Sequence, residues 1–351
     1  MFNKFYSLGK EGNSMDLNKM EEVRNFTGHK YLIRMMEPGD WLRHYNEGDE
    51  VVNDFILPRG PRQKDEFSDT VYHKNATVPY HWHEHGFETF EIARGSVDCV
   101  IDGKHFIAKT GDLLHIPPYT AHGFVFLEEG TIWRELFQEM DMSGGIFEKN
   151  IVNAYYDSMK EDPAFMAMYR SGKTMRREEP AVWSQPPVDH SQVFQCRTPD
   201  FAWARHEGEG YSIQLKICKW ETAGCKEIWH ADLKKGLKVE YAYPHRGYDM
   251  FYVQKGSLEV TIDHSYESAE PQTFVAGPDT IIDIPPYHTY TIRVLEDAAL
   301  YNYGGEYDLK ACLEDLASVK RDAPERIAAK EDYLAFLRQY GVYATNMTFE
   351  G

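Results

Sequence analysis

The sequence has 351 residues, enough for two domains of common size, and 42% of them are hydrophobic. It holds 56 acidic residues against 38 lysines and arginines, and the net charge of −18 would repel a phosphate backbone. No apolar run approaches the roughly 20 residues of a membrane helix, and residues 1–30 lack the apolar stretch of a secretory signal. We therefore expect a cytoplasmic globular protein that binds neither nucleic acid nor membrane. Its charge would keep a homo-oligomer soluble.

Two stretches of the chain, residues 87–124 and 248–292, share one layout. Each has an aromatic-rich strand that ends at a glycine, a hydrophobic strand that closes on an acidic residue, and an apolar strand that ends in the tetrapeptide IPPY. The matching positions are Gly95 and Gly256, Asp102 and Asp263, and Ile116 and Ile284. A repeat with so long a period indicates a duplicated unit. Short β-rich runs between Gly, Pro and Asp turns predict antiparallel barrels or sandwiches.

The segments around these copies have other patterns. Apolar residues at helical spacing between 146 and 159 predict a helix, and a Pro-rich irregular stretch follows it. The tail, residues 308–340, is again helical, with a break near Ala323 and Pro324. The predicted divisions are an N-terminal extension (1–70), a first barrel core (71–140), a helical connection and linker (141–210), a second barrel core (211–305) and C-terminal helices (306–351).

The stretch PYHWHEHGFETFEIARG carries most of the chemistry. Side chains alternate along a strand, so His81, His83 and His85 would point to one face. A slip in strand parity at the following glycine would bring Glu88 to that face. The stretch GDLLHIPPYTAH then places His122 after a proline turn, at the start of a strand. Three imidazoles and one carboxylate suit Mn, Fe, Ni, Co, Cu or Zn.

These two stretches resemble the two motifs of the cupin superfamily. The first motif is HxH, three or four residues, Glu, six residues and Gly; the second is Gly, five residues, Pro and then His. The matching positions here are His81, His83, Glu88 and Gly95, then Gly111, Pro117 and His122. The family usually has a glycine two residues after that proline, where this chain has Tyr119. The resemblance implies an all-β chain of two cupin (double-stranded β-helix or jelly-roll) barrels. It also implies that the first barrel holds one divalent transition metal through His81, His83, Glu88 and His122.

The second copy differs at the ligand positions. Counted from its glycine, Asp249 stands for Glu88, Ala242 and Pro244 stand for the two histidines, and Tyr290 stands for His122. A shift of one residue would offer Tyr243 and His245 instead. We expect a metal-free second barrel kept for packing; an altered site is the alternative.

Four further residues are site candidates. His85 shares the phase of the metal ligands and could act as a general acid or base, or be a structural histidine. Phe90, Phe124 and Phe126 share the phase too, so they would either fill the core or line a pocket for a flat or cyclic substrate.

Three functions remain open. The preferred one is an enzyme that uses the metal as a Lewis acid on a small oxygenated, possibly cyclic diketone or enolic, substrate in hydrolase or lyase chemistry, such as hydrolysis of a C–C bond. The alternatives are a ring-cleaving dioxygenase similar to the flavonol-cleaving bicupins and a non-enzymatic small-molecule-binding cupin. His85 favours the first, since hydrolysis or elimination needs a proton-transfer group.

Overall fold

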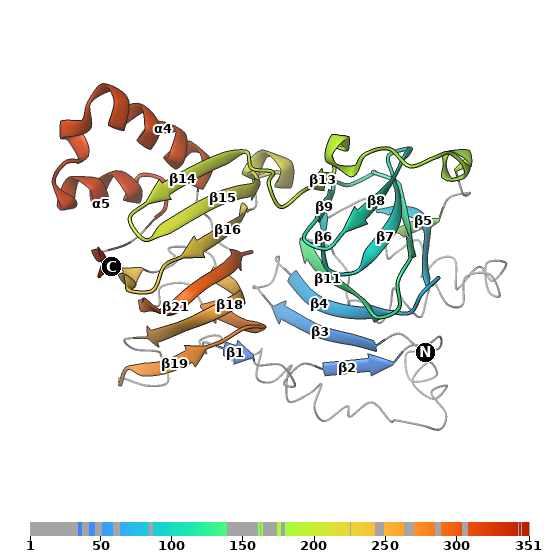
Figure 1. Cartoon of the computed structure of the whole chain (residues 1–351), viewed down its shortest axis with the longest axis horizontal. Helices are drawn as coiled ribbons and strands as arrows, with labels where there is room; N and C mark the ends of the chain where they lie inside the picture. Colours follow the sequence, from blue (N-terminus) through green and yellow to red (C-terminus); the bar gives the residue numbers. More distant parts are fainter. Residues whose placement is uncertain are drawn as a thin grey trace.

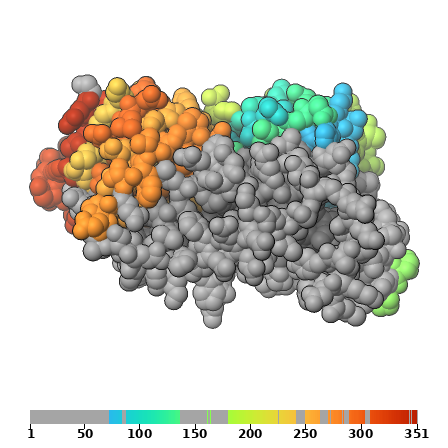
Figure 2. Space-filling model, turned by 90° about the horizontal axis from the view of Figure 1, so that it is seen from below, coloured from blue at the N-terminus to red at the C-terminus, as the bar shows by residue number. Residues whose placement is uncertain are grey.

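The structure is a computed structural model. It describes residues 34–36, 42–45, 51–58, 64–83, 87–138, 161, 163, 174–176, 180–224, 226–242, 249–262, 270–284, 289–303, 308–342, 344 and 346–350. Figure 1 shows two β-rich lobes side by side, with helices α4 (Leu309–Asp322) and α5 (Lys330–Arg338) at the outer end of the second lobe. Figure 2 shows the described parts of the two lobes along the long axis of the molecule. The predicted all-β fold of two barrels in one chain, with C-terminal helices, is confirmed.

The first barrel consists of two antiparallel sheets. The five-stranded sheet contains, in order, β12 (Thr174–Arg176), β5 (Thr77–His83), β10 (His122–Phe126), β7 (Ser96–Ile101) and β8 (Lys104–Lys109). The seven-stranded sheet contains β13 (Cys196–Arg197), β9 (Leu113–Ile116), β6 (Phe87–Arg94), β11 (Thr131–Gln138), β4 (Lys64–Tyr72), β3 (Val51–Pro58) and β2 (Leu42–Tyr45). Because side chains alternate along each strand, one face of each sheet lines the barrel interior.

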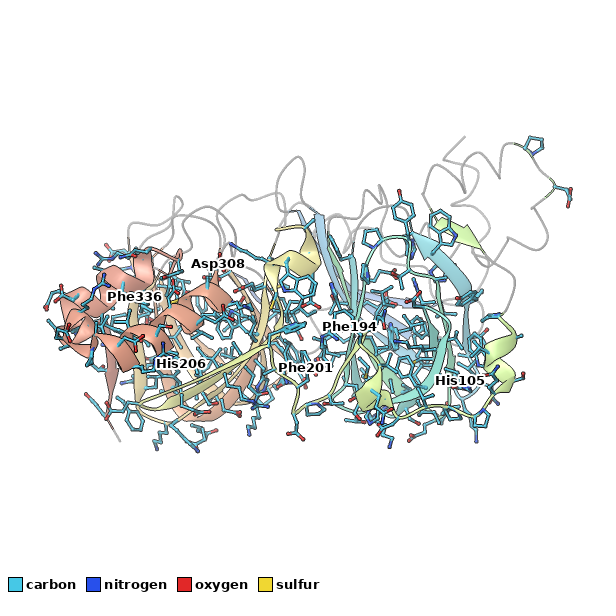
Figure 3. All side chains as sticks on the ribbon, turned by 90° about the horizontal axis from the view of Figure 1, so that it is seen from above. His105, Phe194, Phe201, His206, Asp308 and Phe336 are labelled. Carbon is cyan, nitrogen blue, oxygen red and sulfur yellow. The ribbon has the colours of Figure 1, made fainter. Side chains whose placement is uncertain are left out.

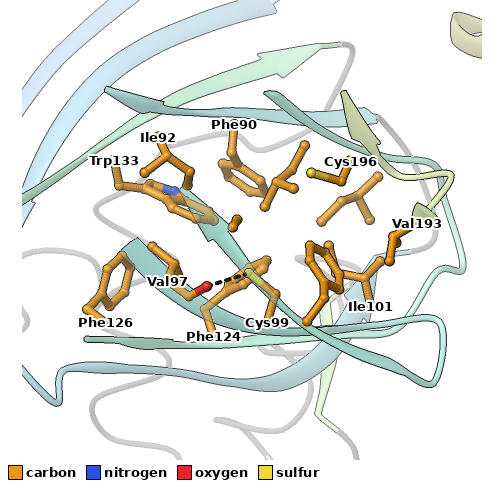
Figure 4. Packing of buried hydrophobic residues seen from close by; sticks show 14 of the residues in the cluster. Phe90, Ile92, Val97, Cys99, Ile101, Phe124, Phe126, Trp133, Val193 and Cys196 are labelled. Atoms are coloured by element: carbon orange, nitrogen blue, oxygen red, sulfur yellow. Dashed lines mark hydrogen bonds between the residues drawn. The ribbon is translucent and has the colours of Figure 1, made fainter. Parts of the chain in front are cut away.

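Aromatic rings fill much of that interior (Figure 4). The centroid of the Trp133 ring lies 4.4 Å from that of Phe90 and 4.7 Å from that of Phe124. Phe126 stacks on Tyr72 with a centroid distance of 3.6 Å. Packing of this kind makes the barrel a rigid support for polar groups placed inside it.

The second barrel is one curled sheet. Its main path contains β1 (Arg34–Met36), β20 (Thr280–Ile284), β18 (Asp249–Ile262), β21 (Tyr290–Asn302), β16 (Ile228–Leu233), β15 (Tyr211–Ile217) and β14 (Ala204–Gly208). β17 (Leu237–Ala242) pairs with β21 and with β22 (Asn346–Phe349), and β19 (Gln272–Ala276) pairs with β18. The long strands β18 and β21 pair with each other near both of their ends, so they link the two halves of the barrel.

The strand register repeats between the barrels. In the first barrel His122 pairs with His81, and in the second Tyr290 pairs with Ala242. These are the positions that the sequence repeat made equivalent. Ala242 therefore stands at the place of a histidine, with no side-chain donor.

The repeat extends to the IPPY turns and the glycines. Glu88 pairs with the isoleucine that starts the first IPPY, and Asp249 pairs with the isoleucine that starts the second. Gly95 and Gly256 have φ values of 92° and 79°. A Cβ on Gly95 would lie 2.6 Å from Thr131 Oγ1, and one on Gly256 would lie 2.3 Å from a backbone oxygen. Both repeat glycines are thus required for conformation and for space.

Several segments join a barrel other than at the predicted boundaries. Strands β2, β3 and β4 extend the first barrel's sheet into the predicted N-terminal extension, while β1 pairs with β20 of the second barrel. Within the predicted linker, β12 and β13 pair with first-barrel strands and β14 joins the second sheet. Strands β1, β2, β12, β13 and β14 end the paths of their sheets and are two to five residues long, too short for alternation to reveal their partners. The helix predicted between 146 and 159 lies outside the described residues.

The C-terminal helices pack on the second barrel, as expected from their apolar stripes. Helix α4 buries Leu309, Cys312, Leu313 and Leu316, and the short helix η5 (Pro324–Ile327) separates it from α5. Two carboxylates cap the first turn of α4. Asp308 accepts the N–H of Ala311, and the buried Glu227 accepts the N–H groups of Leu309 and Lys310. Among the described residues, none of the helices is long and apolar enough to cross a membrane.

The two barrels meet through a buried polar cluster. The Glu91 carboxylate of β6 accepts a hydrogen bond from Gln254 Nε2 at 3.0 Å and another from Tyr303 at 3.4 Å, both of the second barrel. Arg134 of β11 pairs with Glu91 at 3.1 Å, and its guanidinium carbon lies 3.8 Å from the centre of the Tyr252 ring. The outward faces of β6 and β11 are therefore buried against the second barrel.

The connection between the barrels is also fixed by a buried charge. Arg197 pairs with Glu221 of the helix η4 (Lys219–Thr222), and its guanidinium carbon lies 4.4 Å and 4.7 Å from the ring centres of Phe194 and Phe201. Figure 3 shows these two phenylalanines between the lobes. In the connection between the barrels, Arg197 is therefore both ion-paired with Glu221 and covered by aromatic rings.

Candidate metal centre

The two histidines of the HxH motif point into the first barrel, as the alternation predicts. His81 and His83 are 3% and 4% exposed, whereas Trp82 between them is only partly buried. Their Nε2 atoms lie 3.1 Å apart. At this distance one ring nitrogen can donate a hydrogen bond to the other, or both can bind the same partner.

Glu88 and His122 complete the group, but in a different way from the prediction. Glu88 does not continue the histidine strand with a slip in parity; it lies on β6 of the other sheet. Its Oε1 is 3.0 Å from His83 Nε2, and its Oε2 is 2.8 Å from His122 Nε2. The ligand atoms of the four residues all lie within 4.8 Å of one another. The two sheets therefore bring the motif together across the barrel interior.

Backbone carbonyls orient two of the imidazoles. His81 Nδ1–H donates to the Pro79 carbonyl at 2.6 Å, and His122 Nδ1–H donates to the Thr120 carbonyl at 2.9 Å. Each bond places the ring proton on Nδ1 and leaves the Nε2 lone pair for the group: that of His122 lies 2.8 Å from Glu88 Oε2, and that of His81 lies 3.1 Å from His83 Nε2. The amide of Tyr119 donates to the His83 carbonyl at 2.7 Å, which ties the proline turn to the end of β5.

The donor set fits a divalent metal ion. His122 Nε2 is buried and makes no hydrogen bond in the described part of the chain, although a carboxylate oxygen lies 2.8 Å from it. Two lone pairs directed at one point repel each other unless a proton or a metal ion stands between them. Three imidazole nitrogens and a carboxylate are ligands for Mn, Fe, Co, Ni, Cu or Zn.

The three pocket candidates lie in the aromatic core. Phe90, Phe124 and Phe126 are 2%, 1% and 0% exposed. The ring of Phe124 lies 5.5 Å from that of His122, so it is the candidate next to the ligand group. That these side chains line a substrate pocket stays a prediction.

Sequence reasoning missed a second carboxylate in the barrel. Glu135 on β11 is 7% exposed and accepts a hydrogen bond from Trp133 Nε1 at 3.0 Å. It pairs directly with Phe90, which makes it a diagonal neighbour of Glu88 on the same face of the sheet. The Cα atoms of diagonal neighbours on paired strands are typically about 7–8 Å apart. Because side chains alternate along a strand, Glu135 points to the same face as the core residue Trp133, and this alternation was the signal that the sequence offered. The remaining candidate, His85, lies outside the described residues, and its role stays a prediction.

The second barrel has a hydrogen-bonded cluster at the equivalent place. Tyr290 OH donates to Asp249 at 3.0 Å, and the Asn302 amide donates to the same carboxylate at 3.3 Å. All three residues are buried. The carboxylate that corresponds to Glu88 thus has neutral donors as its neighbours. The absence of metal from this barrel stays a prediction.

Comparison with known proteins gives the class. A family described as the Cupin domain matches residues 69–132. Similar solved structures include an oxalate decarboxylase formate complex from Lactobacillus farciminis, with a TM-score of 0.53 and 15% identity over 78% of this chain and 85% of that chain. The Bacillus subtilis oxalate decarboxylase structure at pH 4.6 has a TM-score of 0.51 and 14% identity over 97% and 98%. A Bacillus subtilis oxalate decarboxylase structure that was studied for its Mn(II) centres has a TM-score of 0.51 and 14% identity over 89% of both chains.

No curated protein sequence gives a significant match. At these identities the structural likeness defines the fold, that of a two-barrel cupin. Residues 69–132 thus match the Cupin domain, and the repeated barrel has the fold of a two-barrel cupin.

Proposed function

We propose that the chain is a metal-dependent enzyme that cleaves a C–C bond in a small oxygenated substrate, by non-redox hydrolysis or lyase chemistry. One divalent transition metal would be held by His81, His83, Glu88 and His122. The observation that carries this proposal is the convergence of three Nε2 atoms and one carboxylate in a buried barrel, with the His122 nitrogen lacking a hydrogen bond.

Charge supports a Lewis-acid site. Three neutral imidazoles and one carboxylate would leave a divalent ion with a net charge of about +1. Such an ion, when bound, polarises a substrate oxygen and lowers the pKa of bound water. The similar structures are oxalate decarboxylases by name, which favours a substrate with adjacent or closely spaced carbonyl groups.

Glu135 is the described group best placed to move a proton. Its carboxylate lies in the barrel interior on the strand next to Glu88, and the Trp133 indole fixes its orientation. It would hold or deliver the proton that a C–C cleavage requires at carbon or oxygen. His85, which the sequence predicts on the ligand face, is the second candidate for that role.

Two other functions compete. A quercetinase-like dioxygenase would need oxygen for every turnover. A binding cupin would retain its ligand unchanged. The buried ligand set and a neighbouring interior carboxylate favour catalysis over binding, because ionisable groups gathered in a buried site are typical of active sites.

Metal binding is tested first. Protein loaded with Mn(II) should retain close to one ion per chain, and His83→Ala or His122→Ala should remove most of it, as measured by elemental analysis after gel filtration. His206→Gln, in the second barrel, is the matched control and should keep the metal. Retention of Mn(II) by both ligand variants would refute the proposed site.

The reaction is tested with manganese-loaded protein under nitrogen and in air. Oxalate and a panel of cyclic 1,3-diketones serve as substrates, and products are identified by mass spectrometry. Cleavage without oxygen supports the proposal, whereas turnover only in air indicates the dioxygenase. Glu135→Gln should lower the rate about 10²–10⁴-fold with unchanged metal content; Glu129→Gln, at an exposed carboxylate, should not.

A further inference from the structure

A second group of ligand-type side chains lies in the first barrel, away from the four-residue centre. It contains Asp112 from the turn before β9, His190 from the helix η3 (His190–Gln192) and Cys196 from β13. Their ligand atoms lie within 4.8 Å of one another. Asp112 and Cys196 are 1% and 4% exposed, while the His190 side chain is 21% exposed. The group is thus closed on the barrel side and partly open at the histidine.

All three side chains face one another. His190 Nδ1 lies 2.6 Å from Asp112 Oδ2 and 4.0 Å from Cys196 Sγ. The thiol also contacts the Asp112 carboxylate, and burial together with that carboxylate raises the pKa of Cys196. Without a cation, the group therefore holds its protons in a hydrogen-bonded set in which one carboxylate serves both partners.

We propose that Asp112, His190 and Cys196 bind a second divalent cation, of the thiolate-preferring zinc type. Thiolate, imidazole and carboxylate are the three donor types that proteins offer to zinc. Tetrahedral zinc with normal bond lengths separates its ligand atoms by about 3.3–3.8 Å. The observed separations of 2.6 and 4.0 Å lie on either side of that range, so small side-chain shifts suffice. Water, as a fourth ligand, would reach the cation from the partly exposed side at His190.

This site would fasten the connection between the barrels to the first barrel. Cys196 pairs with Leu114 of β9, and its amide donates to the Val193 carbonyl at 2.9 Å. Figure 4 shows Cys196 and Val193 together at the edge of the barrel core. The next residue is the arginine that pairs with Glu221 of the second barrel. A cation here would join the β8–β9 turn, η3 and β13 at the start of the inter-barrel contact. The proposal does not depend on the proposed function.

The sulfur ligand gives the site a distinct signature. The four-residue centre has only nitrogen and oxygen ligands, so a thiolate-to-cobalt charge-transfer absorption distinguishes a site with a sulfur ligand from that centre. Full-length protein, stripped of metal and titrated with Co(II), should develop that absorption in the near ultraviolet. His83→Ala should keep it, and Cys196→Ser should lose it. Cys312→Ser, which changes another buried thiol, is the matched control and should keep it.

Zinc binding and stability complete the test. With Zn(II), Cys196→Ser and His190→Gln should each bind about one ion per chain fewer than the wild type, whatever the four-residue centre binds. His190→Gln changes a partly exposed residue, so it tests the site even where Cys196→Ser fails to fold, which circular dichroism would reveal. Absence of the cobalt–thiolate band in the wild type, or its survival in His190→Gln with unchanged intensity and affinity, would overturn the proposal and leave a hydrogen-bonded cluster only.

Discussion

At the residue scale, burial determines which side chains carry charge. His115 on β9 is 3% exposed; its Nδ1 lies 3.0 Å from Thr89 Oγ1 and its Nε2 lies 3.3 Å from the Glu221 carbonyl. Burial lowers the pKa of His115 to about 4. The imidazole is therefore neutral at physiological pH and bridges the first barrel to the helix η4 of the second.

This shift predicts a loss of stability in acid. The unfolded chain binds the His115 proton near pH 6.5 and the folded chain only near pH 4, so stability falls as the pH drops through that interval. The full effect is about 3 kcal/mol. His115→Gln should flatten the dependence of the unfolding free energy on pH between 7 and 4, measured with urea. Equal slopes in the wild type and in His115→Gln would contradict the assignment.

The ligands could be predicted at this scale because motif spacing needs no knowledge of partners. His81, His83, Glu88 and His122 were named from strand alternation and from their match to the motifs of the family that the sequence resembles, and the structure brings them together. Glu135 was missed because a single carboxylate on a strand has no distinguishing neighbours in sequence. Only the pairing of β11 with β6 shows that it lies near Glu88.

At the element scale, the start of helix α4 depends on a carboxylate from another strand of the chain. Glu227 is 2% exposed and accepts two N–H groups of the first turn. Burial raises the pKa of Glu227 to about 7, against the opposing effect of these hydrogen bonds. The helix terminus is thus attached to the barrel through a group that titrates near neutrality.

The sign of this effect is opposite to that of His115. The folded state holds the Glu227 proton more tightly than the unfolded state, so its contribution is complete below about pH 4.5 and is lost as the pH rises to about 7. Glu227→Gln should therefore gain about 1–3 kcal/mol relative to wild type between pH 5 and pH 8. Urea unfolding at both values measures this change. Glu314→Gln, on the exposed face of the same helix, should show no such gain, and a constant difference for Glu227→Gln would contradict the pKa shift.

Helices and strands could be predicted where the sequence repeats or where apolar residues form a strong stripe. They could not be predicted where the pairing partner determines which sheet a strand joins. The helical tail with its break at Pro324 appears as expected. The sheet membership of the HxH strand could not be predicted, because residues 84–86 connect two sheets and alternation alone does not distinguish a slip from a crossing. The strands before residue 64 are recognised only through their pairing with the barrel.

At the scale of the whole molecule, the two barrels form one unit through buried charges. Glu91 and Arg134 have side chains 5% and 4% exposed, and Gln254 and Tyr303 of the other barrel donate to the same carboxylate. Removal of one partner would leave a buried charge without compensation, which is costly. The ion pair therefore couples the stability of one barrel to that of the other.

Glu91→Ala should lower the unfolding free energy by about 3–5 kcal/mol. Calorimetry should also show the single transition broaden or separate into two, because the inter-barrel contacts are lost. Lys234→Ala, which removes an exposed ion pair with Asp297, is the control and should change stability by about 0.5 kcal/mol or less. A change of similar size in both variants would show that the buried cluster contributes no coupling.

The pairing of β1 with β20 has a consequence for synthesis on the ribosome. Arg34 pairs with Asp283, so the partner of this strand emerges only after almost the whole second barrel has been made. Strands β2 to β4, which follow β1 closely, can join the first barrel much earlier. Strand β1 can therefore pair only after the strands that follow it have been made, and contacts so distant in sequence form slowly. Until β20 is made, β1 has no partner strand, and the β1 segments of nascent chains on one messenger are open to pairing with each other.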